Sequence, residues 1–142
     1  DPRLRRRRTA RVIAVDSSAL VAIVLGEPDA EPLLQVLLRE EAIVSAASVV
    51  EAAIVVEARQ GADATRDLHL LLEAVARVVP FDAEHAHAAL GAWRRFGKGR
   101  HPAGLNFGDC LAYATAQLAD VALLFTGDDF PQTDVRAVAI AP

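Results

Sequence analysis

The feature that most constrains the fold of this chain is the alternation of short β-branched runs with longer segments of helical periodicity. The run at 12–15 is apolar at every position, which is typical of a strand that is buried on both faces. Further runs that we interpret as strands lie at 42–45, 78–81, 121–125 and 137–140. This order predicts an α/β fold of three layers, α/β/α, in which helices flank a central, mostly parallel sheet of four to five strands.

Capping residues and apolar stripes place the helices between these strands. Ser17 or Ser18 is suited to cap the first helix, which ends at Gly26. A proline in the run at 78–81 favours an edge position for that strand. The expected helices cover residues 19–25, 28–38, 48–60, 63–76, 82–96 and 106–119.

The charge of the chain is unevenly distributed along its 142 residues, a length that suits one domain. Residues 1–11 hold six of the fifteen Lys and Arg side chains, and we interpret them as a flexible basic N-terminal extension. Residues 12–142, which we interpret as the single domain, carry nine basic and eighteen acidic side chains. A body this acidic repels nucleic acid at long range, so RNA binding would need a local basic patch or bound cations.

The compartment is suggested by the cysteine count and by the N-terminal segment. Cys110 is the one cysteine, so no disulfide can form within the chain, which fits a reducing cytoplasm. The arginines followed by 12–25 superficially resemble a secretory signal, but Asp16 and two serines interrupt the apolar stretch. That stretch is also too short to span a bilayer, so we expect a cytoplasmic protein without a membrane segment.

Acidic residues follow the predicted strands at the same end of the sheet. Asp16 comes directly after the first strand, and Glu51 lies near the start of the helix after the second. Asp109 lies in the first turn of the helix at 106–119, and Asp128 and Asp129 follow the fourth strand. Because the carboxyl ends of parallel strands share one edge, we expect these side chains to converge there.

Converging carboxylates repel one another and persist by holding protons or by binding a cation. Oxygen ligands without a matching His or Cys set favour Mg²⁺, with Mn²⁺ also possible, over zinc. A divalent ion held by few carboxylates keeps positions open for water and phosphate. Such a site is equipped for phosphodiester hydrolysis without a side-chain nucleophile.

Local structural roles compete with this interpretation. The stretch 48–51 also fits a helix capping box, and 106–109 fits another. The stretch 128–129 could form only a turn. Asp16 is harder to explain structurally, because a carboxylate at the end of a buried strand is costly.

At this point the chain resembles the PIN-domain ribonucleases, specifically the VapC toxins of type II toxin–antitoxin (VapBC) systems. The resemblance covers nearly the whole chain from Val12 onward. The four blocks that carry it, in order, lie at 15–20, 45–52, 96–110 and 124–130, and the third is the most specific.

The resemblance implies a PIN-like fold and a set of site residues. Asp16, Glu51 and Asp109 would bind one or two Mg²⁺ or Mn²⁺ ions, and Ser18 would support the site by hydrogen bonding. A fourth acid is expected after the fourth strand. Many relatives carry extra residues before the following phenylalanine, so two adjacent acids compete for that role: Asp128 and Asp129.

The resemblance also implies an activity and partners. The chain would be a toxin that hydrolyses single-stranded RNA as a metal-dependent endoribonuclease. It would form a homodimer and bind a cognate VapB-type antitoxin, whose tail would cover the acidic groove.

The basic loop before Asp109 is the candidate RNA contact. Lys98 and Arg100 could hold phosphates beside the metal, although cations also suit the end of a helix. His101 could contact RNA or make a hydrogen bond within the loop. Trp93, Phe96 and Phe107 could stack on bases, but their spacing favours core positions.

Two other functions stay open. A catalytically silent PIN-like domain would only bind an antitoxin or another partner. A metal-dependent phosphatase could use Asp16 as a nucleophile, although that chemistry usually needs a second acid where Ser18 stands. A nucleotide-binding module lacks support, because no Gly-x-Gly-x-x-Gly follows the first strand.

Overall fold

The computed structural model describes residues 10–140. Residues 1–9 and 141–142 lie outside this range, so the predicted basic extension at 1–11 falls almost entirely outside it and stays a prediction.

The centre of the molecule is a four-stranded parallel sheet. Its strands are β1 (Val12–Val15), β2 (Glu41–Ser45), β3 (Ala76–Val79) and β4 (Ala122–Leu124), in the order β3-β2-β1-β4. Ile13 of β1 lies opposite both Ala42 of β2 and Ala122 of β4, and each of the three strand pairs is parallel. The predicted parallel sheet is confirmed, and the proline-bearing run supplies β3 at the edge, ending just before Pro80.

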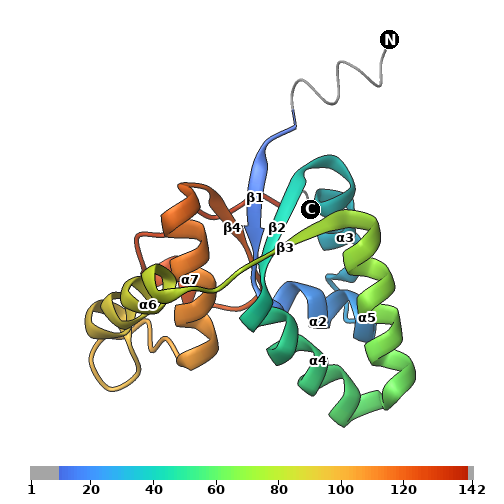
Figure 1. Cartoon of the computed structure of the whole chain (residues 1–142), viewed down its shortest axis with the longest axis horizontal. Coiled ribbons are helices and arrows are strands. Elements are labelled where there is room, and N and C mark those ends of the chain that lie inside the picture. The colour runs from blue at the N-terminus through green and yellow to red at the C-terminus, as the bar shows by residue number, and fades with distance from the viewer. Residues whose placement is uncertain (1–9, 141–142) are drawn as a thin grey trace.

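Six helices within residues 10–140 cover the two faces of this sheet (Figure 1). The chain crosses one face twice, and the connection from β3 to β4 crosses the other face. The first group comprises α2 (Ser17–Leu25), α3 (Ala30–Arg39), α4 (Ala46–Gln60) and α5 (Ala62–Val75). The second group comprises α6 (Ala83–Phe96) and α7 (Phe107–Ala119), and a short 3₁₀ helix, η1 (Phe130–Gln132), follows β4. The predicted three-layer arrangement is therefore confirmed.

Two hydrophobic cores form because successive side chains of a strand point to opposite faces. Ile13 and Val15 of β1 pack with α2 to α5, whereas Ala14 packs with α6 and α7. The same division occurs in β2, where Val44 enters the first core and Ile43 the second. Burial on both faces explains why these strands are apolar at nearly every position.

The expected fifth strand at 137–140 does not form. Ala137 makes a single parallel bridge to Leu123, whose N–H donates to the Arg136 carbonyl at 2.8 Å and whose carbonyl accepts from Val138 at 3.0 Å. The segment before this bridge is bound to α6 and α7, because Asp134 accepts hydrogen bonds from the Tyr113 hydroxyl and from Arg95. Most side chains from Arg136 onward are exposed, so little burial favours a longer ladder.

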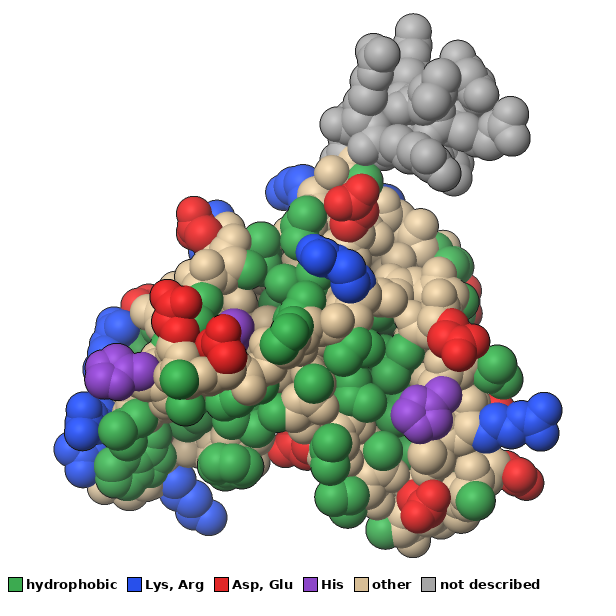
Figure 2. Space-filling model, in the orientation of Figure 1, with side chains coloured by type: hydrophobic (Ala, Val, Ile, Leu, Met, Phe, Trp, Pro, Cys, Tyr) green, Lys and Arg blue, Asp and Glu red, His purple; other side chains and the backbone are tan. Residues whose placement is uncertain are grey.

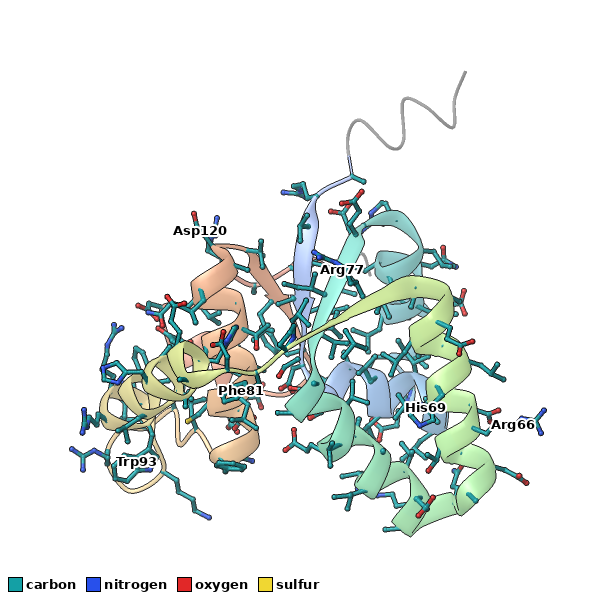
Figure 3. The ribbon with its side chains drawn as sticks, viewed as in Figure 1. Arg66, His69, Arg77, Phe81, Trp93 and Asp120 are labelled. Carbon is teal, nitrogen blue, oxygen red and sulfur yellow. The ribbon has the colours of Figure 1, made fainter. Side chains whose placement is uncertain are left out.

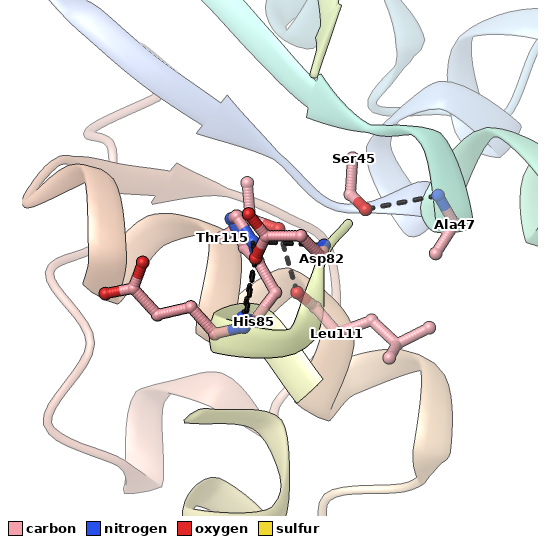
Figure 4. A network of polar contacts seen from close by, with 7 residues as sticks. Ser45, Ala47, Asp82, His85, Leu111 and Thr115 are labelled. Atoms are coloured by element: carbon pink, nitrogen blue, oxygen red, sulfur yellow. Dashed lines mark hydrogen bonds and ion pairs between the residues drawn. The ribbon is translucent and has the colours of Figure 1, made fainter. Parts of the chain in front are cut away.

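Several helix starts are fixed by side-chain caps (Figure 4). The Ser45 hydroxyl accepts from the Ala47 N–H at 3.1 Å, so α4 begins directly after β2. The expected capping box at 48–51 is therefore wrong, because Glu51 lies past the first turn of α4. The cap of α6 is as predicted, with Asp82 accepting from the His85 backbone N–H at 3.2 Å.

None of the helices within residues 10–140 is both long enough and apolar enough to cross a membrane.

Candidate active site

The acidic residues gather where the strand order changes direction. From β1 the chain proceeds to β2 on one side, and β4 pairs with β1 on the other, which makes the carboxyl end of β1 a topological switch point. Asp16 stands there, and its backbone N–H donates to the Leu124 carbonyl at 2.9 Å. Figure 2 shows acidic side chains in the notch between the α6–α7 side of the molecule and the α4–α5 side.

Asp16 itself caps α2, and not Ser17 or Ser18 as expected. Its Oδ2 accepts from the Ser18 N–H at 3.0 Å. The residue is 3% exposed, and its Oδ1 is buried without a hydrogen-bond partner. A buried acceptor without a partner is costly and calls for a cation or a proton.

The electrostatic surroundings of Asp16 bring three predicted acids together. Burial raises the pKa of Asp16 to about 6, hydrogen bonds from Ser18 lower it, and the charges of Asp109 and Glu51 raise it further. Asp16, Glu51 and Asp109 therefore share one electrostatic environment, although they belong to three different helices or their caps: α2, α4 and α7.

Glu51 lies on α4 and is half-buried. Its Oε1 accepts a hydrogen bond from the Ser17 hydroxyl at 2.6 Å, which links α4 to the first residue of α2. The Ser17 hydroxyl thus holds Glu51 near Asp16, and the sequence pattern did not reveal this contact.

Asp109 takes part in the cap of α7 and also lies near the other acids. The predicted capping box is present, with the Asn106 N–H donating to Asp109 Oδ2 at 3.0 Å and Asn106 Oδ1 accepting from the Asp109 N–H at 2.8 Å. This cap engages one of the two carboxylate oxygens. Burial raises the pKa of Asp109, and the charges of Asp129 and Glu51 add to this effect.

The two adjacent acids after β4 differ in their electrostatic effect on the site. The charge of Asp129 raises the pKa of Asp109, whereas Asp128 does not contribute to the shifted pKa of Asp16 or Asp109. Asp128 instead offers its backbone carbonyl to the side chain of Gln132 at 3.3 Å. Both residues lie in the bend after β4, and Asp129 is the one of the two whose charge reaches Asp109.

Ser18 ties the site to the segment after β4. Its hydroxyl accepts from the Thr126 N–H at 3.0 Å, across 108 positions of sequence. Together with the contact to Asp16, this bond fixes the end of β1 against the turn that carries Asp129.

The predicted RNA-binding loop follows α6. The Arg100 guanidinium donates to the Arg94 carbonyl at 3.2 Å and lies 4.7 Å from the Trp93 ring centroid, so it closes the helix end. His101 accepts from the Ala103 N–H through Nδ1 at 3.0 Å, which confirms the hydrogen bond within the loop. Lys98 is exposed.

An apolar groove of about 730 Å³ lies between α6 and α7, and its lining includes Asn106, which caps α7. Its lining also includes Lys98, Phe81, Trp93 and Phe107, and Figure 3 labels Trp93 on α6 and Phe81 just before that helix begins. Phe107 is 81% exposed and Trp93 is half-exposed, so the expected core positions are confirmed only for Phe96.

The acidic residues of this site are chemically suited to bind a divalent cation. Their donors are carboxylates alone, and the unpartnered Asp16 Oδ1 is the buried atom that a cation would satisfy. Within the part of the chain that the structure describes, no three His, Cys, Asp or Glu side chains are gathered tightly enough to hold a metal as they stand. Uncompensated carboxylates repel one another, so a closer approach would accompany binding.

Sequence reasoning missed Ser17 and Gly108, which both touch Glu51. The sequence hinted only at Gly108, because a glycine within a helix lowers helix stability and therefore suggests another role at that position.

The chain is similar to known proteins along most of its length. A family model described as "PIN domain" matches residues 13–136. "Ribonuclease VapC" of Mycolicibacterium smegmatis is 49% identical over 129 residues, which is 89% of this chain and 99% of that protein. "Ribonuclease VapC30" of Mycobacterium tuberculosis is 44% identical over 130 residues, 90% of this chain and 99% of that protein.

Solved structures share the fold at low sequence identity. The crystal structure of Mycobacterium tuberculosis VapC20, described as a Sarcin-Ricin loop cleaving toxin, has a TM-score of 0.74 at 18% identity and covers 89% of this chain and 98% of that one. The structure of VapBC2 from Rickettsia felis, bound to a DNA fragment from their promoter, has a TM-score of 0.70 at 12% identity and covers 89% and 96%.

Proposed function

Because this chain belongs to the PIN-domain family, among the VapC ribonucleases, we propose that it is a metal-dependent endoribonuclease that acts as the toxin of a toxin–antitoxin pair. The observation that carries the metal site is the buried, unpartnered Oδ1 of Asp16, with Asp109 and Glu51 near enough to raise the pKa of that residue. A carboxylate in these surroundings is stabilised by a proton or a cation, and a bound divalent cation is one means of promoting hydrolysis of a phosphodiester.

We propose that Asp16, Glu51 and Asp109 hold Mg²⁺ or Mn²⁺, with Asp129 as the fourth acid. When bound, the ion would supply positive charge against the phosphate and lower the pKa of a bound water. The chain's own groups prepare for this by fixing one oxygen of each of two aspartates: the Ser18 N–H holds Asp16 Oδ2 and the Asn106 N–H holds Asp109 Oδ2. Asp16 must also lose its proton, which becomes favourable as the pH rises past its pKa of about 6.

The RNA contact is proposed chiefly for Lys98. It is exposed, and it borders the groove whose other wall, α7, carries Asp109. A cation there would offset the acidic body for an approaching phosphate chain. Arg100 lies on the same loop, although its guanidinium also closes α6, and His101 is better suited to shaping the loop than to binding RNA.

We further propose that the protein pairs with a second copy of itself and with a VapB-type antitoxin. Large apolar side chains are exposed on both sides of the acidic notch: Val50 and Ile54 of α4 are 58% and 64% exposed, and Phe107 of α7 is 81% exposed. Apolar surface of this kind is typical of an interface. Such a protein would act in the cytoplasm, where its RNA substrate is found.

Cleavage of a total-RNA pool by the purified, antitoxin-free protein tests the activity. We expect cleavage with Mg²⁺ or Mn²⁺, loss of cleavage in EDTA, and recovery when excess Mg²⁺ is returned. Asp16→Asn should be inactive, whereas Asp67→Asn should cleave normally, because Asp67 is an exposed acid on α5. A folded protein that never cleaves RNA in any metal would refute the activity.

The same preparation separates the two competing functions. A phosphatase would hydrolyse small phosphate esters, and Asp16→Asn would abolish that reaction. A catalytically silent domain would bind an antitoxin peptide without any turnover of RNA or ester.

A further inference from the structure

The Glu51 carboxylate is held by one hydroxyl. Ser17 Oγ donates to Glu51 Oε1 at 2.6 Å, a short bond of the kind formed between a hydroxyl and an ionised acceptor. Ser17 directly follows Asp16, so the N-cap and first residue of α2 supply one acid of the site and the group that holds another.

The other oxygen of the same carboxylate lies against the backbone of α7. A Cβ built on the buried Gly108 would overlap Oε2 of Glu51. Gly108 lies in the helix, and its φ is outside the left-handed region, so the backbone does not require glycine there. Gly26 shows the contrast, since its φ is +68° and a Cβ there would meet nothing within 4 Å. Gly108 therefore provides space, at the expense of helix propensity.

These two contacts place Glu51 relative to both neighbouring acids. Ser17 is adjacent to Asp16 and Gly108 is adjacent to Asp109, so any shift of α2 or α7 moves an acid together with the group that locates Glu51. A free glutamate side chain has several rotamers to lose, and its charge is repelled by the other two acids. The hydrogen bond from Ser17 and the packing against Gly108 restrict the Glu51 side chain and hold it near the other acids in the absence of a cation.

We propose that Ser17 and Gly108 are positioning residues that form a slot for the Glu51 carboxylate and thereby set the affinity of the site for a divalent cation. This inference rests on the proposed metal-dependent function.

Calorimetric titration with Mn²⁺, without RNA, tests the slot. For Ser17→Ala we expect an increase of about tenfold in the Mn²⁺ dissociation constant, with Ser17→Thr closer to the wild type because it keeps a hydroxyl. The matched control is Thr65→Ala, which removes a hydroxyl bond of 3.1 Å to Glu57 at an exposed α4–α5 contact and should leave Mn²⁺ affinity unchanged.

Gly108→Ala should weaken Mn²⁺ binding at least as much, because the new methyl group displaces the carboxylate. Gly91→Ala is its control, since a Cβ at that position of α6 meets nothing within 4 Å. If Gly108→Ala does not fold, Ser17→Ala still decides the question.

A double-mutant cycle shows whether Ser17 acts through Glu51. Ser17→Ala should have little further effect on Mn²⁺ affinity in a Glu51→Gln background, and urea denaturation in EDTA should show coupling between the two positions. The positioning role would be refuted, and the metal site would stand, if the wild type bound Mn²⁺ no better than folded Ser17→Ala. It would also be refuted if the losses of Mn²⁺ affinity from Ser17→Ala and Glu51→Gln were additive. Wild-type protein that binds no Mn²⁺ would overturn the metal site, and the positioning role with it.

Discussion

Replacing Asp16 by asparagine should stabilise the metal-free protein at neutral pH while abolishing its activity. Asparagine can keep the bond to the Ser18 N–H, since its side-chain oxygen is an equally good helix cap. Its amide group would replace the unpartnered Oδ1 and face the neighbouring carboxylates with a donor in place of a charge. The substitution therefore removes an electrostatic cost and keeps the local structure.

The magnitude follows from the pKa of Asp16, which burial raises from 3.8 to about 6. A raised pKa means that the folded state holds the proton more tightly than the unfolded state, so stability is lost as the pH rises through this window. Each pKa unit corresponds to about 1.4 kcal/mol, which gives a full cost of about 3 kcal/mol above pH 7. About half of this cost, roughly 1.5 kcal/mol, has accumulated by pH 5.

Urea denaturation in EDTA at pH 5 and pH 8 measures this cost. The advantage of Asp16→Asn over the wild type should be larger at pH 8 by about 1–2 kcal/mol. Asp67→Asn, at an exposed position, should follow the wild type at both pH values. Added Mn²⁺ should stabilise the wild type but not Asp16→Asn. An advantage that does not grow between pH 5 and pH 8 would show that the buried charge is not the source of instability.

Three further outcomes follow from other contacts. Asp129→Asn should lower RNA cleavage tenfold or more, whereas Asp128→Asn should change it by less than about twofold, since Asp129 is the one of these two whose charge affects Asp109. Tyr113→Phe removes the donor to Asp134 and should lower the free energy of unfolding by about 1–2 kcal/mol in urea denaturation. Ile54→Lys should shift a dimer toward monomer in sedimentation, and Leu38→Lys, at an equally exposed site on α3, should not.

The order of elements and the parallel sheet could be predicted because they are written in local patterns. A strand buried on both faces is apolar at most positions: β1 is apolar throughout, and β2 is apolar between Glu41 and Ser45. The terminal strand at 137–140 failed because its fate depends on a distant anchor. Tyr113 and Arg95 hold Asp134, and the described chain then pairs with β4 through a single bridge, from Ala137 to Leu123.

The members of the acidic group were also predictable, because strand ends in a parallel sheet share one edge. Their hydrogen-bond partners were not. The bond from Ser17 to Glu51 joins residues 34 positions apart, and the bond from Thr126 to Ser18 joins residues 108 apart. Such contacts depend on how α2 packs against α4 and β4, which periodicity does not encode. For the same reason the choice between Asp128 and Asp129 needed the structure.

The identity of residue 16 argues for a cation independently of any relative. As a helix cap, asparagine would serve as well as aspartate and would avoid the cost of a buried charge. Asp16 instead leaves an oxygen without a partner and keeps two further acids close to it, at a cost of about 3 kcal/mol at neutral pH. No local structural benefit offsets this within residues 10–140, since the bond to Ser18 would survive the exchange. A bound divalent ion would offset this electrostatic cost, because its charge stabilises the deprotonated form of every acid in the group.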